Sequence, residues 1–272
     1  MKSNKLKKWL AAPYAVWAAG FIIIPLILIL YYAFTGEEGG FTLSNFAYVA
    51  TKENIKALGL ALWLSLLSTA LCLLLAYPLA MILANRNVNQ TSFIVLIFIL
   101  PMWMNFLLRT LAWQTLLEKN GVINSILAFF HLPGISIINT PGAIILGMVY
   151  NFLPFMVLPI YNVLIKIDRD VINAARDLGA NSVQTFLKVT LPLTTPGIVS
   201  GITMVFIPAL TTFVISDLLG GSKILLIGNV IEQEFKQTNN AGSALSTVLM
   251  IFIILSMVLM NKYDKDGEGT AF

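Results

Sequence analysis

Side chains that could perform covalent chemistry are scarce in this chain of 272 residues. His131 is the single histidine and Cys72 the single cysteine, so neither a thiol metal cluster nor an intramolecular disulfide can be built. The sequence has no Gly-x-x-x-x-Gly-Lys phosphate loop, no metal-ligand spacing and no histidine within an apolar stretch. We therefore expect no catalytic residues, no metal site and no cofactor bound by this chain, and hence no enzyme activity of its own.

Polar and charged side chains that could recognise another protein gather in one segment, about 168–192, between two apolar stretches. Asp170 can accept hydrogen bonds from the backbone N–H groups that open a helix. Gly179 stands where this helix would end in a left-handed residue, and Asn181 or Ser182 can cap a second helix. The segment therefore predicts a helix, a tight turn and a second short helix.

The first of these helices carries side chains that suit docking against another protein. Ala174, Ala175 and Leu178 form a small apolar face that lets a second surface approach closely. Arg176 and Asp177 offer opposite charges for docking on the exposed side. The alternative interpretation is a capped surface hairpin without a partner.

The elements that hold this segment are membrane helices. The chain is 58% hydrophobic and 11% charged, with a mean hydropathy of +0.84, whereas about a quarter of the residues of a soluble domain are charged. A hydrocarbon core about 30 Å thick requires roughly 20 apolar residues per helix. Six stretches meet that requirement, at about 10–32, 57–83, 92–116, 142–165, 192–215 and 243–261. We expect a single all-α transmembrane domain over residues 1–272, with an uncleaved first span.

Lysine and arginine are distributed unevenly between the two sides of such a bundle. One set of loops and termini holds Lys2, Lys5, Lys7, Lys8, Arg86, Lys166, Arg169, Arg176, Lys188, Lys262 and Lys265. The opposite set holds Lys52, Lys56, Lys119, Lys223 and Lys236, and Arg109 falls within a span. The positive-inside rule therefore predicts that both termini and the charged segment lie in the cytoplasm. The same bias explains the basic pI without a nucleic-acid partner.

The charged segment resembles the EAA loop of ABC importer permeases. That pattern is Glu-Ala-Ala, three residues, Gly, nine residues, an aliphatic residue, one residue and Leu-Pro. Here every spacing holds from 173 to 192, with an asparagine in place of the glutamate. The resemblance implies a type I ABC importer permease fold of six transmembrane helices, with a loop that fits into an ATPase subunit. The residues that would couple to the ATPase are Asn173, Ala174, Ala175, Arg176, Asp177, Gly179, Leu191 and Pro192.

Other motifs narrow the subfamily. Residues 206–210 (FIPAL), 213–221 (FVISDLLGG), 227–231 (IGNVI) and 100–103 (LPMW) are similar to PotB-type permeases of spermidine/putrescine importers. The resemblance implies a PotC-type second permease, two copies of an ATPase that bind ATP and Mg²⁺, and an extracytoplasmic polyamine-binding protein. It also implies residence in the bacterial inner membrane. The departures are Asn173 and the pair at 211–212, where we expect an acid.

A polyamine path needs carboxylates or aromatic faces that replace part of the hydration of the cation. The candidates are Asp217, Trp103, Trp113 and Tyr150. The tryptophans are equally typical of an interfacial belt, Tyr150 of helix packing, and Asp217 of a cap or a partner of an arginine.

Arg109 is harder to reconcile with a cationic substrate. We expect its side chain to extend outward or to pair with Glu118 or Asp217. If it faces an open cavity, an anionic substrate becomes more plausible.

Two further classes of function stay open. One is an ABC importer for another small solute, such as iron, a phosphonate or thiamine. The other is a multispan scaffold or membrane enzyme without an ATPase, against which the charged segment argues. The outer loops at about 33–56 and 117–141 carry short amphipathic segments, which resemble the rim where a binding protein docks in this fold.

Overall fold

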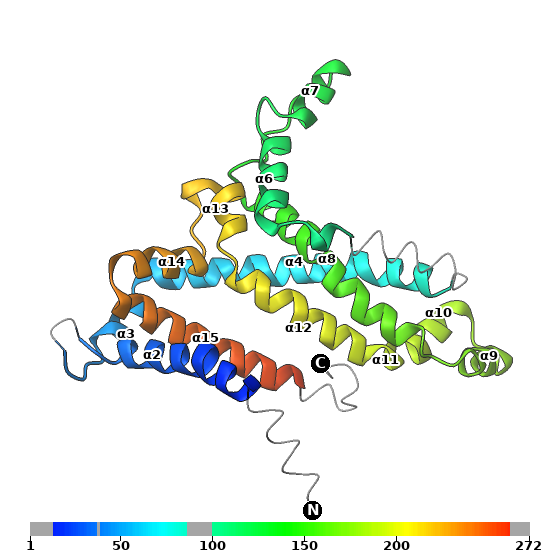
Figure 1. The fold of residues 1–272 in the computed structure, drawn as a ribbon. Coiled ribbons are helices and arrows are strands. Elements are labelled where there is room, and N and C mark those ends of the chain that lie inside the picture. Colours follow the sequence, from blue (N-terminus) through cyan, green and yellow to red (C-terminus); the bar gives the residue numbers. More distant parts are fainter. Residues whose placement is uncertain (1–12, 37–38, 86–99, 262–272) are drawn as a thin grey trace, which may run out of the picture. The chain divides into compact units, whose positions relative to one another are not determined.

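The computed structural model describes residues 13–36, 39–85 and 100–261 (Figure 1). In these ranges the chain is helical, apart from connecting segments and one isolated β-bridge between Thr35 and Phe41. The chain divides into two compact units, one comprising Met1–Lys56 and Val230–Phe252 and the other Ala57–Asn229 and Ile253–Phe272.

Four of the described helices are long and apolar enough to cross a membrane. They are Pro13–Ala33, Lys52–Ala84 (α4), Pro141–Leu164 (α8) and Asn239–Met260, the last lying within α15 (Asn239–Asn261). A bent pair, Ser182–Leu193 and Thr195–Thr211, makes a fifth if it is counted as one span. The number of six spans stays a prediction, because part of the expected third span lies outside the described residues.

In the first unit, polar side chains fasten the end of the first long helix. The helix α2 (Ile24–Ala33) is followed by the short α3 (Ser44–Val49). The side-chain amide of Asn45 donates to the carbonyls of Ala33, at 3.0 Å, and Thr35, at 2.9 Å. Helix ends leave carbonyls unpaired, so Asn45 supplies donors that the backbone lacks. Part of the expected outer loop at 33–56 thus caps a span.

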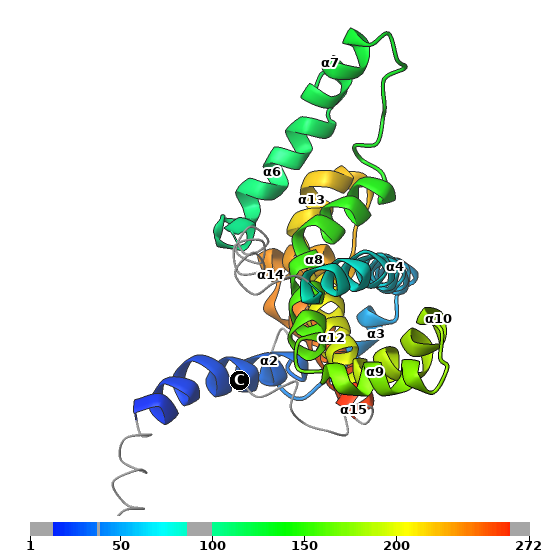
Figure 2. The same ribbon diagram turned by 90° about the vertical axis from the view of Figure 1, so that its right-hand side faces the viewer.

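In the second unit, α12 (Thr195–Thr211) packs along α8 at glycines (Figures 1 and 2). A Cβ atom on Gly197 would lie 2.9 Å from the carbonyl oxygen of Pro159, and one on Gly201 would lie 2.7 Å from the sulfur of Met156. Such distances leave no room for a side chain. The two glycines therefore set how closely these helices approach.

The expected third span is interrupted. Residues 92–99 lie outside the described residues, and the helix α6 begins only at Phe106 and ends at Leu117. It begins there because the Asn105 side chain accepts hydrogen bonds from the backbone N–H groups of Leu107, at 2.9 Å, and Leu108, at 3.3 Å. An asparagine in this role is a strong helix N-cap. The continuous helix expected over 92–116 is thus corrected to one that breaks before Asn105.

The expected fifth span is also divided. Leu191-Pro192 opens a helix of three residues, α11 (Leu191–Leu193), which ends at Thr194 before α12 begins. Helix α12 stops at Thr211, because Thr212 has extended backbone angles, and α13 (Val214–Gly220) follows. The single helix expected over 192–215 is therefore three helices in the structure.

Further short helices lie within or between these elements. They are the π-helix η1 (Ala19–Ile23), α7 (Val122–Phe129), α9 (Arg169–Asp177), α10 (Ser182–Thr185), the π-helix η2 (Phe186–Thr190), the 3₁₀ helix η3 (Gly221–Lys223) and α14 (Ile227–Gln237). Figure 2 shows α6 and α13 at one end of α8, and the loop with α9 and α10 at its other end.

Candidate functional site

The charged loop is two capped helices joined by a tight turn, as the sequence predicts. Gly179 has a φ of +86° after the end of α9, which is the left-handed conformation that glycine adopts without strain. Asn181 and Gln184 form a reciprocal capping box at the start of α10, with bonds of 2.8 and 3.0 Å. The predicted role of Asn181 as a cap is confirmed.

The cap of the first helix differs from the prediction. The side chain of Asp168 accepts from the backbone N–H of Asp170 at 3.0 Å, so Asp168 is the N-cap and Asp170 lies in the first turn. An N-cap has extended backbone angles, and Asp168 has them, with a ψ of 128°. Asp170 still favours the positive end of the helix dipole.

Four large apolar side chains of this loop are exposed. Leu178 is 90% exposed, and Val171, Val183 and Leu187 are also exposed. Ala174 is exposed as expected, whereas Ala175 is half-buried. Exposed apolar side chains grouped on one loop mark an interaction site. The sequence predicts the apolar face on α9, but the contribution of Val183 and Leu187 from the second half of the loop was missed.

The inner surface of the loop borders a cavity of about 820 Å³ at the ends of α4 and α8. Arg169, Asn173 and Arg176 all line it, since positions three and four apart share one face of a helix. No acidic residue is among the described residues that line this cavity. With asparagine at 173, two arginines share this face without a carboxylate between them. Arg176 and Asp177 are both exposed, as expected, and Arg176 also lines the cavity.

One tyrosine of α4 contacts the loop at two points. The hydroxyl of Tyr77 lies 2.7 Å from that of Thr194, and both side chains are buried. The ring of Tyr77 also meets that of Phe186 edge to face, with the centroids 5.5 Å apart. Thr194 is the residue at which Ser182–Leu193 and Thr195–Thr211 bend by 63°. None of these three residues was assigned a role from the sequence.

Two of the four pathway candidates come together. Trp113 of α6 and Tyr150 of α8 form a T-shaped pair with centroids 5.2 Å apart, and both rings are partly exposed. Trp103 is 75% exposed and precedes the break before α6. Asp217 is exposed on α13 and makes no ion pair with any of the described residues. The aromatic pair on α6 and α8 is thus the most defined part of the candidate path.

Arg109 contradicts the expectation that it extends outward or pairs with Glu118 or Asp217. Its side chain is buried, at 7% exposure, and Nε and Nη1 have no hydrogen-bond partner among the described residues. Asn151 on α8 is 1% exposed and donates to the Gly147 carbonyl at 2.9 Å, while its Oδ1 has no such partner. Buried polar groups without partners are costly, so these two are unusual features of α6 and α8.

Asp217 owes its position to a buried asparagine. The side chain of Asn229 accepts from the hydroxyl of Ser216 and from the backbone N–H of Leu226, the latter at 3.1 Å. It also donates to the carbonyl of Phe213 at 3.1 Å. One amide thus fixes both the start and the middle of α13. The segment IGNVI carried the resemblance, but the sequence alone assigned no role to its asparagine.

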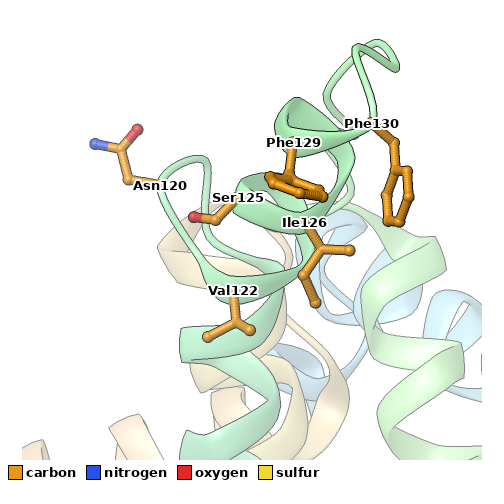
Figure 3. A pocket seen from close by; sticks show the side chains of 6 residues that line it. All are labelled: Asn120, Val122, Ser125, Ile126, Phe129 and Phe130. Atoms are coloured by element: carbon orange, nitrogen blue, oxygen red, sulfur yellow. The ribbon is translucent and has the colours of Figure 1, made fainter.

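The outer loop at 117–141 forms a shallow hollow of about 460 Å³ on α7. Asn120, Val122, Ser125, Ile126, Phe129 and Phe130 line it (Figure 3). The rings of Phe129 and Phe130 lie edge to face, 5.3 Å apart, and both are exposed. Asn124 closes the loop behind this helix by accepting from the Ile135 backbone N–H at 2.7 Å.

Apolar helices long enough to span a membrane, joined by a capped loop with an exposed apolar face, define a membrane permease of the ABC importer class. Residues 76–266 match the model of the binding-protein-dependent transport system inner membrane component, and the chain belongs to this family. The family description agrees with the expected inner-membrane location and with a transport role instead of an enzymatic one.

Named relatives cover nearly the whole chain. It is 39% identical to the spermidine/putrescine transport system permease protein PotB of Haemophilus influenzae, over 96% of each chain. It is 34% identical to the protein of the same name from Escherichia coli K12, over 90% of this chain and 92% of that one. The resemblance to PotB-type permeases is thereby confirmed.

A solved structure supports the fold. The bacterial ABC transporter that imports the acidic polysaccharide alginate matches with a TM-score of 0.79 and 18% identity, over 96% of each chain. The alginate transporter in complex with its alginate-bound periplasmic protein matches with a TM-score of 0.76 and 16% identity, over 97% of this chain and 95% of that one. At such identities the likeness concerns the fold alone, and the predicted importer permease fold is confirmed.

Proposed function

We propose that this chain is a permease subunit of an ATP-driven importer that carries polyamines, spermidine and putrescine, into the cytoplasm. The observation that carries the proposal is the 39% identity, over 96% of both chains, to a relative named as a spermidine/putrescine permease. The chain itself performs no covalent step. Its task is to offer a path for the cation and to respond to the ATPase.

The aromatic pair on α6 and α8 supports a cationic substrate. The ring centroids of Trp113 and Tyr150 lie 5.2 Å apart, and both rings are partly exposed. A cation over such a ring gains about 0.5–2 kcal/mol, depending on how far it is desolvated. Asp217, exposed and without an ion-pair partner among the described residues, is the acid we assign to the same path. Trp103, which is exposed, is a further candidate for contact with the substrate.

The charged loop is the part that we assign to ATPase docking. Its exposed apolar side chains, with Leu178 at 90% exposure, would enter a cleft on one of two ATPase copies, which bind ATP and Mg²⁺. The docking residues are Asn173, Ala174, Ala175, Arg176, Asp177, Gly179, Leu191 and Pro192. The excess of lysine and arginine on this side supports an orientation with both termini in the cytoplasm.

Two other partners complete the proposed assembly. A second permease of the PotC type would supply the other half of the path. An extracytoplasmic polyamine-binding protein would deliver the substrate at the outer loops, where the hollow on α7 offers exposed aromatic rings. The alginate transporter has been solved with a periplasmic protein that holds an alginate pentasaccharide, and this supports a periplasmic partner for the present chain.

Purification of the tagged chain from cells that express its neighbouring genes tests the assembly. We expect an ATPase and a second permease to co-purify. With ATP and the ATPase inside proteoliposomes and the polyamine-binding protein outside, we expect the complex to import radiolabelled spermidine or putrescine. A complex that assembles but does not import either polyamine would refute the substrate and keep the class.

A second candidate, an importer for an anionic solute, depends on Arg109. Its guanidinium is buried, and two of its nitrogens have no partner among the described residues. A positive charge that faced the path would attract anions and repel polyamines, but Arg109 lines neither of the two cavities described above. Import of a phosphonate instead of spermidine by the same proteoliposomes would favour this candidate.

A further inference from the structure

The loop meets the membrane helix α12 at a single residue. Thr194 separates α11 from α12, is fully buried and has backbone angles of φ −91° and ψ −1°. The two segments on either side of it bend by 63°. Thr194 is therefore the covalent joint through which a movement of the docking loop can act directly on α12.

The backbone around Thr194 lacks two donors of an ordinary helix, although the N–H of Thr194 itself bonds to the Thr190 carbonyl at 3.0 Å. The preceding η2 is a π-helix, and Pro192 and Pro196 lack the N–H group of an ordinary helical residue. Beyond the joint, α12 is anchored to α8 where Gly197 meets the Pro159 backbone. The bend angle is consequently set by side-chain contacts to a greater extent than in a continuous helix.

Tyr77 provides such contacts at both ends of the segment from Phe186 to Thr194. Its ring packs against Phe186, the first residue of η2, and its hydroxyl bonds to that of Thr194 at 2.7 Å. The Thr194 hydroxyl also donates to the Leu191 carbonyl at 3.0 Å. Since a hydroxyl has one proton, Tyr77 is the donor in their bond. Tyr77 lies directly before Pro78 within α4.

We propose that Tyr77 is a positioning residue that couples the docking loop to α4 and α12 together. With the hydrogen bond between Tyr77 and Thr194 intact, a displacement of the loop moves α4 and α12 together. Without it, the loop can move while α4 stays, and ATP is hydrolysed with less transport. The inference rests on the proposed function as an ATP-driven permease, but not on the identity of the substrate.

The first test compares Tyr77→Phe with the wild type in the full complex in proteoliposomes. The binding protein is loaded with whichever ligand stimulates the ATPase activity of the wild-type complex. We expect the amount transported per ATP to fall by about threefold to tenfold, the range for one lost hydrogen bond. Maximal ATPase activity and the yield of assembled complex should be unchanged. Thr194→Val should have the same effect, and Thr194→Ser should retain the wild-type ratio.

Two controls separate coupling from general damage. The double variant Tyr77→Phe with Thr194→Val should be no worse than either single variant, because both remove the same bond. Tyr31→Phe removes a hydroxyl from a tyrosine that is 60% exposed and should change nothing. A wild-type transport ratio in Tyr77→Phe, additive losses, or equal loss of ATPase activity and assembly would overturn the proposal.

A second readout needs no substrate. Spin labels at Leu75 and Leu187, both exposed, report the distance between α4 and η2 in a Cys72→Ala background. We expect one narrow distance distribution in the wild type and a broad one in Tyr77→Phe. Equal distributions in the two proteins would refute the positioning role. This readout remains valid if the wild-type complex imports no polyamine, so the two proposals fail separately.

Discussion

Asn229 and Ser216, thirteen residues apart, are joined by a buried hydrogen bond that fixes α13 to the start of α14. The same asparagine holds the carbonyl of Phe213 and the backbone N–H of Leu226. Ser216 and the Phe213 carbonyl also bond to each other, at 2.9 Å, so removal of Asn229 leaves the backbone N–H of Leu226 as the group without a partner among the described residues.

We therefore predict that Asn229→Ala destabilises the protein. Each buried polar group left without a partner costs about 1–3 kcal/mol, so the thermal midpoint in detergent should fall by several degrees. Asn120→Ala, at an exposed position, is the matched control and should leave the midpoint unchanged. A midpoint unchanged in Asn229→Ala would mean that α13 is held by other contacts.

The two glycines between α8 and α12 should respond differently to alanine. At Gly197 the new Cβ meets the backbone oxygen of Pro159, which cannot move aside, whereas at Gly201 it meets first the flexible side chain of Met156. We predict that Gly197→Ala costs about 1–3 kcal/mol as overpacking and Gly201→Ala less. Gly59→Ala, with nothing within 4 Å, is the control and should be neutral or slightly stabilising. Unfolding curves in detergent rank the three variants by their loss of stability. A larger loss for Gly201→Ala than for Gly197→Ala would contradict the close packing of α12 on α8.

The turn of the docking loop offers a test of coupling. Proline cannot adopt the φ of +86° found at Gly179, so Gly179→Pro should distort the turn and leave the membrane helices intact. We expect transport to fall by about tenfold or more, which corresponds to a loss of roughly 1.4 kcal/mol in the free energy of docking to the ATPase. Gly179→Asn should retain most of the transport, because asparagine tolerates this conformation.

A charge on the same loop should act in the same direction. Ala175 is half-buried on α9, and Ala175→Glu introduces a carboxylate where close packing is expected. We predict reduced uptake with normal membrane insertion, measured by transport and by the amount of protein in the membrane fraction. Normal uptake in both Ala175→Glu and Gly179→Pro would refute the coupling role.

The aromatic pair makes a prediction about substrate affinity. Trp113→Ala removes one face of the pair with Tyr150, and the loss of about 0.5–2 kcal/mol would raise the concentration for half-maximal transport by roughly twofold to thirtyfold. Trp103→Ala should have a smaller effect, because Trp103 is 75% exposed and forms no ring pair among the described residues. Equal effects in the two variants would indicate that both tryptophans are general interfacial anchors.

Features that depend on local chemistry were predictable from the sequence. The left-handed turn at Gly179 and the cap at Asn181 follow from the backbone preferences of those residues. Asp168 and Asp170 are both acids that can cap, and the sequence alone does not fix which one has extended backbone angles. The break before α6 had a signal that could have been used, because Asn105 precedes an apolar run as an N-cap does.

Features that depend on distant contacts were not predictable. Tyr77 looks like one more aromatic residue in an apolar stretch, and its role appears only when Phe186 and Thr194 lie beside it. The position of α13 depends on Asn229, which follows it in the chain. The burial of Arg109 ran against the expectation of an outward or paired side chain, since the local sequence does not indicate which neighbours cover it.

The most direct test is the ATPase activity of the reconstituted complex with a loaded binding protein, comparing spermidine, putrescine, ferric iron and a phosphonate. We predict stimulation by the polyamines alone. Stimulation by iron or the phosphonate alone would contradict the polyamine substrate, and failure of the chain to assemble with any ATPase would contradict its function as an importer permease.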